Sequence, residues 1–209
     1  MKYKLKSSKG WVVKNQRPEE FLLGPKFYYS DEEVERYSRS SGMKKAQEKI
    51  AFRVLKLLSI PEGSTLLDLG SGPGITAEVY RSEGFKVTCL DVIPKMLEKA
   101  EAKGFACVLG DMRNLKELFP KRKFDGVVSV SALQWLKNSE DVKQLAEGIF
   151  FVLKKNSPCI IQFYPKSEQE LKDVLGIFKQ AGFSGNSVTD NPGNPRKRTI
   201  FLVLKKTSN

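Results

Sequence analysis

Short runs of apolar residues alternate along this chain with longer segments in which apolar and polar residues recur at helical spacing. The apolar runs predict buried strands at residues 65–69, 86–91, 106–110, 124–130 and 158–164. The amphipathic segments that follow them predict helices at residues 75–83, 94–103, 140–153 and 168–181. Strands that alternate with helices form βαβ units, so the pattern predicts a mostly parallel sheet covered by helices.

The two ends of the chain depart from this alternation. Ser30 is followed by three acidic residues, which indicates the start of a helix, and a second helix is predicted over about residues 43–59. Residues 187–189 and 199–204 have strand character and only a loop between them, so they predict a terminal antiparallel pair. The expected fold class is α/β, with a mostly parallel seven-stranded sheet and a terminal antiparallel strand.

The division of the chain follows from the same pattern. A chain of 209 residues favours one domain with a single large core. We expect residues 1–60 to form a basic N-terminal arm and a helical cover, and residues 61–209 to form the core domain. Residues 11–13 could add a short strand.

The most informative segment follows the first predicted strand. Asp68 precedes the glycine-rich turn Gly70-Ser71-Gly72-Pro73-Gly74, and glycines let the backbone pass close to a ligand. Dinucleotide-binding turns have the spacing G-x-G-x-x-G, whereas this turn has G-x-G-x-G after an acid. An acid there would repel a pyrophosphate, but it suits the cationic sulfonium and ammonium groups of S-adenosylmethionine. The alternative is a tight turn without a ligand.

Two further acids follow predicted strands. Asp91 comes about 20 residues after the turn, where a carboxylate can accept hydrogen bonds from ribose hydroxyls. Asp111 can accept a hydrogen bond from the adenine amino group, while Val92 and Met112 enclose the ring. A helix-capping role is the alternative for Asp111, and core packing is the alternative for Met112. Parallel strands end at one edge of a sheet, which places around one crevice Asp68, Gly70, Asp91, Asp111 and Ser129.

The segment after the fourth strand bears on the methyl acceptor. Methylation of the adenine amino group usually uses an N-P-P-Y type motif there, whereas this chain has Ser129-Val130-Ser131-Ala132-Leu133-Gln134-Trp135. The chain contains no histidine, so the site is expected to be poor in general bases. Such a site suits an acceptor with a free lone pair, such as guanine N7, although a carboxylate or a water could still act as a base. Trp135 and Tyr164 follow strand ends, where they could stack on a splayed guanine or pack in the core.

Basic residues are concentrated at the two ends of the chain. The formal net charge is +12, and residues 1–18 and 193–209 both contain several basic residues and no acid. Two basic ends on a nearly neutral centre indicate arms that contact RNA phosphates. The alternative is that these residues only keep the protein in solution.

Composition narrows the class of protein further. No apolar run approaches the roughly 20 residues of a membrane span, and no apolar segment typical of a signal peptide follows the basic N-terminus. The three cysteines are scattered, which is typical of reduced thiols in a cytoplasmic protein. Without histidine or paired cysteines, we expect no transition-metal site.

The ordered motifs resemble the guanine-N7 methyltransferases of small-subunit ribosomal RNA, and the chain looks like an archaeal-type relative. The resemblance covers about residues 17–205, and its most specific segments are S-A-L-Q-W-L at 131–136, Q-F-Y-P at 162–165 and A-G-F-S-G at 181–185. The glycine and aspartate motifs are common to all class I, Rossmann-like methyltransferases. The family often has cysteine where this chain has Ser71.

The resemblance completes the set of candidate site residues. The candidate cofactor-binding residues are Tyr37, Asp68, Gly70, Ser71, Gly72, Asp91, Val92, Asp111, Met112 and Ser129. Among them, the resemblance implies that Tyr37 covers the methionine end of the cofactor and that Ser129 also faces the target base. The candidate residues that position the acceptor are Gln134, Trp135 and Tyr164.

The resemblance also implies partners. Enzymes of this kind need a small zinc-binding activator subunit, which pairs with a sheet edge. Residues 106–109 are an edge strand in the usual order, and the alternative is that the N-terminal segment covers them. The expected function is S-adenosylmethionine-dependent methylation of guanine N7 in ribosomal RNA or a small-subunit precursor, as part of ribosome biogenesis. The alternatives are a small-molecule methyltransferase of the same fold and an assembly factor that acts mainly by binding.

Overall fold

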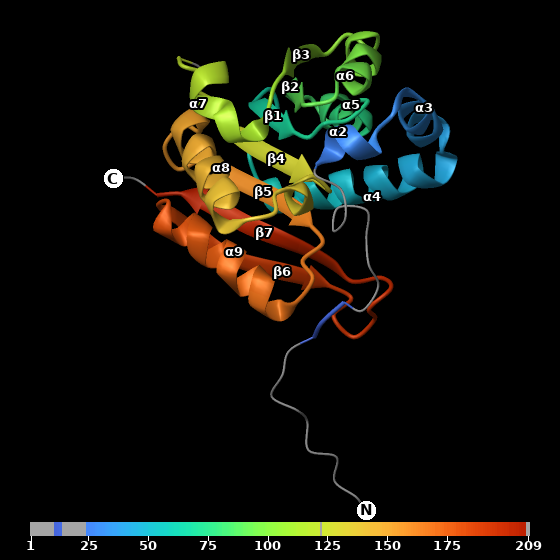
Figure 1. Ribbon diagram of the computed structural model, residues 1–209. Coiled ribbons are helices and arrows are strands. Elements are labelled where there is room, and N and C mark those ends of the chain that lie inside the picture. The colour runs from blue at the N-terminus through green and yellow to red at the C-terminus, as the bar shows by residue number, and fades with distance from the viewer. Residues whose placement is uncertain (1–10, 14–23, 122, 208–209) are drawn as a thin grey trace, which may run out of the picture.

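The computed structural model describes residues 11–13, 24–121 and 123–207, and within them a seven-stranded sheet lies between two layers of helices (Figure 1). The strands in spatial order are β3 (Ala106–Leu109), β2 (Lys86–Asp91), β1 (Thr65–Leu69), β4 (Gly126–Val130), β5 (Pro158–Phe163), β7 (Thr199–Lys206) and β6 (Phe183–Asp190). Strands β1 to β5 are parallel, and β7 runs antiparallel to both of its neighbours. The predicted α/β fold with its terminal antiparallel pair is confirmed.

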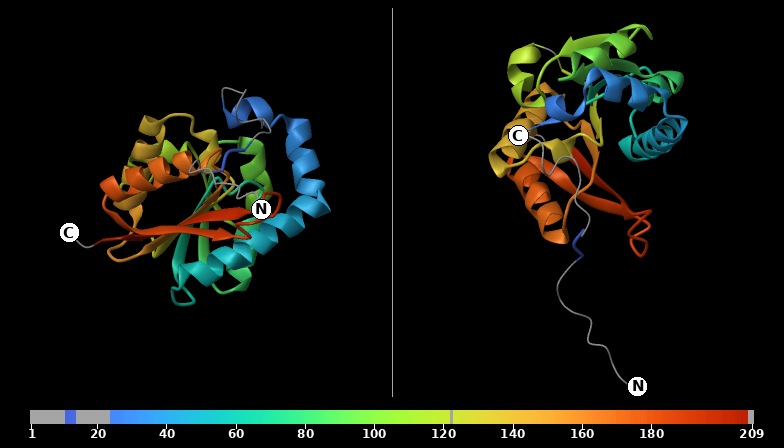
Figure 2. Two further views of the ribbon diagram at one scale, coloured as in Figure 1. Left: turned by 90° about the horizontal axis from the view of Figure 1, so that it is seen from below. Right: turned by 45° about the vertical axis from the view of Figure 1, so that its right-hand side comes forward.

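Helices cover both faces of the sheet (Figure 2). One face carries α4 (Ser41–Leu58), α5 (Ile75–Ser82) and α6 (Pro94–Glu101), and the other carries α7 (Leu115–Leu118), α8 (Ser139–Val152) and α9 (Glu168–Gln180). Two further helices precede the first strand along the chain, namely α2 (Pro25–Tyr28) and α3 (Asp31–Arg39). Two short 3-10 helices follow strands, namely η1 (Met112–Asn114) after β3 and η2 (Leu133–Trp135) after β4.

The central strands are apolar on both faces because both faces are covered. Ile160 of β5 packs in the cluster beneath α4 and α5, whereas its neighbour Ile161 packs in the cluster beneath α8 and α9. Successive side chains of a strand point to opposite faces, so a strand buried on both sides is mostly apolar along its length. This explains why the predicted strands appear in the sequence as continuous apolar runs.

The N-terminal helices begin where serine side chains cap them. The hydroxyl of Ser30 accepts a hydrogen bond from the backbone N–H of Glu33, and Ser40 does the same for Met43 at the start of α4. Helix α4 therefore begins two residues before its predicted start. The short strand expected at residues 11–13 is reduced to one bridge between Val12 and Ser167.

The basic C-terminal segment is not an arm within the described residues. Arg196 and Lys197 lie in the loop between β6 and β7, whereas Lys205 and Lys206 lie at the opposite end of β7. The ammonium group of Lys206 donates hydrogen bonds to the carbonyls of Phe150 and Leu153, so it is occupied within the fold. The expected cluster is split because the length of β7 separates the two groups of basic residues. The basic residues of the expected N-terminal arm, within residues 1–18, all lie outside the described residues.

The turn after β1 gives a direct test of the fold. Gly70 has φ +69°, and a Cβ atom built there would lie 2.4 Å from Cβ of Ala132. We expect Gly70→Ala to lower the free energy of unfolding by about 2 kcal/mol or more, because it adds both strain and overlap. Urea unfolding measures this loss. In the matched control Gly42→Ala, no described heavy atom lies within 4 Å of the new methyl group, so stability should be kept or slightly raised. Equal stability of the two variants would contradict the packing argument.

Candidate active site

The backbone of the glycine turn is held against the end of β2. The N–H groups of Gly70 and Ser71 both donate to the carbonyl of Leu90, at 2.8 and 3.1 Å. Gly72 has φ +55°, and its N–H donates to Oδ2 of Asp91 at 2.8 Å. The turn therefore reaches across the crevice between β1 and β2 and is closed by Asp91.

Asp91 has two tasks in this arrangement. Its Oδ1 atom accepts a hydrogen bond from the backbone N–H of Ile93 at 2.9 Å, so each carboxylate oxygen holds one side of the crevice. Burial raises the pKa of Asp91, and the backbone N–H groups of Ile93 and Gly72 oppose that shift. A carboxylate can accept about four hydrogen bonds, so Asp91 retains capacity for ligand hydroxyls.

The side chains of three predicted cofactor-site residues are buried in the fold and are not part of the wall of the main cavity. Asp68 is 1% exposed, and its Oδ2 accepts a hydrogen bond from Thr76 at 2.7 Å. The hydroxyl of Ser129 donates to the carbonyl of Leu69 at 2.9 Å, and Ser71 is also buried. The expectation that Asp68 and Ser129 face the crevice is wrong in this respect, because β1 and β4 point these side chains into the fold.

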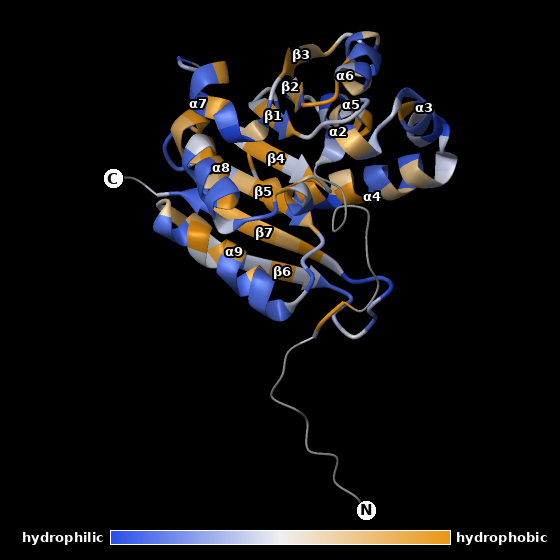
Figure 3. Cartoon of the chain, viewed as in Figure 1, coloured by the Kyte–Doolittle hydropathy of each residue, from blue (hydrophilic) through white to orange (hydrophobic). Residues whose placement is uncertain are grey.

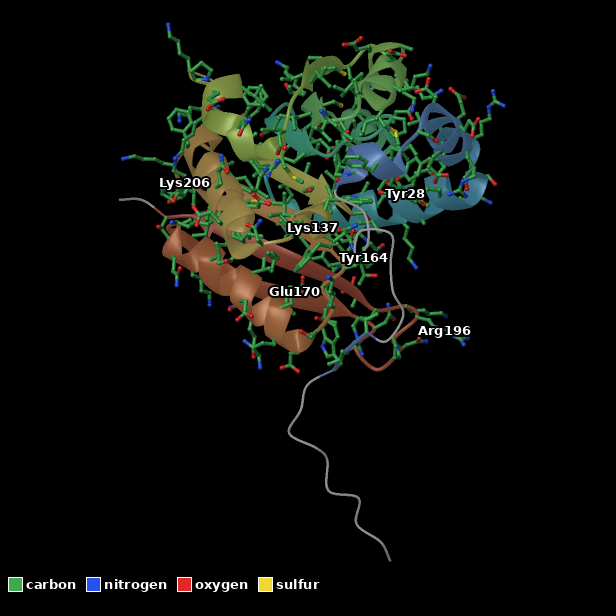
Figure 4. The ribbon with its side chains drawn as sticks, in the orientation of Figure 1. Tyr28, Lys137, Tyr164, Glu170, Arg196 and Lys206 are labelled. Atoms are coloured by element: carbon green, nitrogen blue, oxygen red, sulfur yellow. The ribbon has the colours of Figure 1, made fainter. Side chains whose placement is uncertain are left out.

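A cavity of about 830 Å³ opens at the carboxyl ends of the parallel strands, beneath α2 and α3. It is lined by most of the predicted site residues, namely Tyr37, Gly70, Gly72, Asp91, Val92, Asp111, Met112, Gln134, Trp135 and Tyr164. Tyr28, Lys137 and Tyr164 lie in the same region, between α2 and the ends of β4 and β5 (Figure 4). The volume of the cavity suits a nucleoside-sized ligand together with part of a second molecule.

Asp111 caps η1, which is the alternative that the sequence left open. Its Oδ1 accepts from the backbone N–H of Arg113 at 2.9 Å, and the Arg113 guanidinium also binds Asp111 and Asp141. Burial alone would raise the pKa of Asp111, but the Arg113 guanidinium holds it below its ordinary value. The carboxylate therefore stays charged and lines the cavity, where it can still accept from an amino group.

Aromatic rings form one wall of the cavity. The ring centroid of Trp135 lies 5.8 Å from that of Tyr28 and 6.0 Å from that of Tyr29, and Tyr29 lies 6.0 Å from Tyr37. Burial raises the pKa of Tyr37 to about 12, so its hydroxyl is neutral, and it accepts a hydrogen bond from Gln47. Residues 27–29 also match the family that the chain resembles, but the sequence predicts no site role for Tyr28 or Tyr29, because their contact with Trp135 is not visible in the sequence.

Gln134 is fixed by a chain of hydrogen bonds that begins in the core. Gln162 is fully buried, and its Oε1 accepts from both the N–H and the hydroxyl of Ser131. The carbonyl of Ser131, whose φ is +58°, accepts from Nε2 of Gln134 at 2.8 Å. Oε1 of Gln134 finds no partner within the described residues. The amide is therefore held in one orientation, and sequence reasoning missed the roles of Ser131 and Gln162.

None of the carboxylates that line the cavity is a free base within the described residues. Asp91 is bound by backbone N–H groups, while Asp111 and Asp141 share Arg113. The described segments bring together no group of three metal-binding side chains. No helix in the described part of the chain has the length and apolar character needed to cross a membrane. The arrangement can orient and desolvate two ligands, but its described residues include no evident group for removing a proton.

Comparison with known proteins identifies close relatives. Residues 67–161 match the model of the methyltransferase domain family. The 18S rRNA (guanine(1575)-N(7))-methyltransferase of Saccharomyces cerevisiae is 36% identical over 202 residues, which are 90% of this chain and 72% of that protein. The 18S rRNA (guanine-N(7))-methyltransferase of Bos taurus is 31% identical over 207 residues, with 92% and 72% covered. The fold is similar to magnesium protoporphyrin IX methyltransferase from Synechocystis with bound SAM, with a TM-score of 0.66, 16% identity, and coverage of 93% and 100%.

The buried carboxyl of Asp68 predicts a pH dependence of stability. Burial raises its pKa to about 7, well above that of an unfolded aspartate at roughly 4. Between these values the folded protein binds more protons than the unfolded chain, so this residue's contribution to stability falls as the pH rises. Asp68→Asn should remove that fall, and urea unfolding of both proteins across the range measures the difference. Parallel pH profiles for wild type and variant would exclude the raised pKa.

Proposed function

This chain belongs to the family of 18S rRNA (guanine-N7)-methyltransferases, and we propose that it transfers a methyl group from S-adenosylmethionine to N7 of a guanine in small-subunit ribosomal RNA. The observation that carries the reaction type is the cavity itself, in which an aromatic wall faces carboxylates that are already hydrogen-bonded. Guanine N7 has a lone pair at neutral pH, so its methylation requires alignment rather than removal of a proton.

The residues of the crevice fit the cofactor. S-adenosylmethionine supplies an electrophilic methyl group on a sulfonium centre. Asp91 would accept from ribose hydroxyls, and Asp111 from the adenine amino group, with Val92 and Met112 on either side of the ring. Gly70 and Gly72 leave room for the ligand because they carry no side chain. Tyr37 would cover the methionine end.

The residues behind the turn support this site indirectly. Asp68 holds Thr76, the second residue of α5, and Ser129 holds the carbonyl of Leu69 just before the turn. Both contacts fix the backbone to which Gly70 and Ser71 belong. We propose that Asp68 and Ser129 act on the cofactor by positioning the turn, and that Ser71 acts as a buried part of that turn.

The acceptor would lie between the cofactor site and the loop after β4. Trp135 would hold the face of the guanine ring, and Tyr164 would close the far side. Gln134 lines the cavity with its amide oriented by Ser131, and it would lie beside an edge of the base. In this proposal residues 1–60 supply a basic arm and the helical cover, and residues 61–209 supply the methyltransferase core. A cytoplasmic location remains a prediction.

We also propose that a small zinc-binding activator subunit pairs with β3. This strand is at an edge of the sheet, and no other described strand is paired with its outer side. Ala106 and Leu109 are exposed, with Leu109 at 56%, whereas Val108 packs against the chain's own core. An exposed apolar edge favours pairing with a strand of another chain.

The acceptor atom can be tested chemically. Small-subunit ribosomal RNA incubated with the protein and methyl-labelled cofactor should gain label, and reduction followed by aniline should then cleave it at N7-methylguanosine. Trp135→Ala should lower turnover on the order of 100-fold and leave cofactor affinity unchanged, because the ring acts on the orientation of the acceptor. Trp135→Phe is the matched control that retains a ring.

Two results would contradict this assignment. Label without a new cleavage site would mean that another atom is methylated. The absence of label from RNA, with cofactor binding intact, would favour a small-molecule substrate.

The activator interface gives a second test. The N–H of Gly110 donates to the carbonyl of Asp91, so the N–H of the preceding residue, Leu109, points away from β2. Leu109→Pro removes this outward donor and should prevent co-purification with a co-expressed activator of the family, whereas Leu109→Ala should retain it. Calorimetric titration with the cofactor controls for damage to the cavity, which Leu109 also lines. A stable complex of the proline variant would contradict pairing at this edge.

A further inference from the structure

The outer face of α4 carries three lysines and one aromatic ring in a single stripe. Lys45, Lys49, Phe52 and Lys56 are spaced by four, three and four residues, which places them within about 60° of one another around the helix. The opposite face packs on the sheet through Ala51, Val54 and Leu58. All four side chains of the stripe are exposed, including Phe52 at 47%. We call these four residues the α4 stripe.

The lysines of the α4 stripe are not neutralised within the described residues. None of them forms an ion pair there. The one acidic residue of α4, Glu48, pairs instead with Lys44, with 3.9 Å between Oε1 and Nζ. Lys45 and Lys56 are about 16 Å apart along the helix axis at 1.5 Å per residue. The stripe is therefore a row of unpaired positive charge with a ring in its middle.

A second basic segment joins the α4 stripe. Arg53, next to Phe52, binds the carboxylate of Asp190 through two hydrogen bonds of 2.9 and 3.0 Å. Asp190 ends β6, and the loop that follows carries Arg196 and Lys197, both exposed. This loop is strongly hydrophilic (Figure 3), and Arg196 points outward at its tip (Figure 4). The ion pair thus fixes the helix beside the basic loop.

We propose that the α4 stripe and the loop between β6 and β7 form a second RNA-binding surface, outside the cavity, which holds the RNA strand away from the target guanine. The proposal rests on the proposed function, because that function supplies an RNA substrate. Lysines bind phosphates and release counterions, and an exposed ring can stack on an unpaired base. A lipid surface is a poorer partner, because the apolar face of α4 is already buried against the sheet.

The salt dependence of RNA binding tests the surface. The affinity of the full chain for a fluorescently labelled, unstructured RNA oligonucleotide is measured between 50 and 200 mM salt. Lys45→Ala/Lys49→Ala/Lys56→Ala should reduce the slope of log affinity against log salt by about 2. Over this fourfold salt range, the wild type should therefore lose about 20-fold more affinity than the triple variant.

A charge-matched control separates the surface from net charge. Lys121→Ala/Lys143→Ala/Lys179→Ala removes three exposed lysines from the layer of α7, α8 and α9, on the other face of the sheet from α4, and it should leave the slope nearly unchanged. A slope that falls equally in both variants, or in neither, would overturn the proposal. Circular dichroism melting verifies that both variants are folded.

Phe52 provides a readout that charge does not affect. Phe52→Ala should weaken RNA binding on the order of tenfold at every salt concentration and leave the slope unchanged. Phe52→Tyr keeps the ring and should restore affinity. Full affinity of Phe52→Ala would remove the ring from the proposed surface.

This proposal and the proposed function fail in different ways. If the wild type methylates ribosomal RNA but the α4 variants keep their salt slope, the surface proposal alone is wrong. If the wild type methylates no RNA, the proposed function is wrong, while the binding slopes still show whether the surface takes RNA.

Discussion

The site depends on the hydrogen bonds that tie the glycine turn after β1 to the end of β2. Gly70 and Ser71 donate to the carbonyl of Leu90, and Gly72 donates to Asp91. These contacts require a backbone with left-handed φ at Gly70 and room beside Ala132, which only glycine provides. Because the turn is fixed from both sides, the start of α5, the position of Asp91 and the floor of the cavity are all set together.

The sequence predicts this part of the site well because its determinants are local. The glycine turn and Asp91 belong to adjacent βα units, and the order of parallel strands places their ends at one edge. The sequence could not predict the aromatic wall, because Tyr28 and Trp135 are separated by about 100 residues and meet only after α2 folds over the cavity. Nor could it predict which way Asp68 and Ser129 point, since the register of β1 and β4 decides whether an acid faces solvent or core.

The electrostatics of the cavity limit the chemistry it can perform. Each carboxylate on its wall is held by donors from the protein, and the nearby tyrosines are neutral because burial raises their pKa. Such groups attract and orient a cationic ligand without competing as bases or nucleophiles. The arrangement therefore favours transfer to an atom that already has a free lone pair.

An acceptor of that kind places the burden of catalysis on alignment. A guanine that needs no deprotonation reacts only when it is held in line with the methyl group, and this alignment costs entropy. Contacts remote from the reacting atoms can offset that cost, because binding energy gained along the RNA can be used to fix the base. A cavity with few catalytic groups and the proposed basic surface on α4 would therefore act together to align the base. The cavity selects the atom, and the surface holds the rest of the RNA in the orientation that the cavity needs.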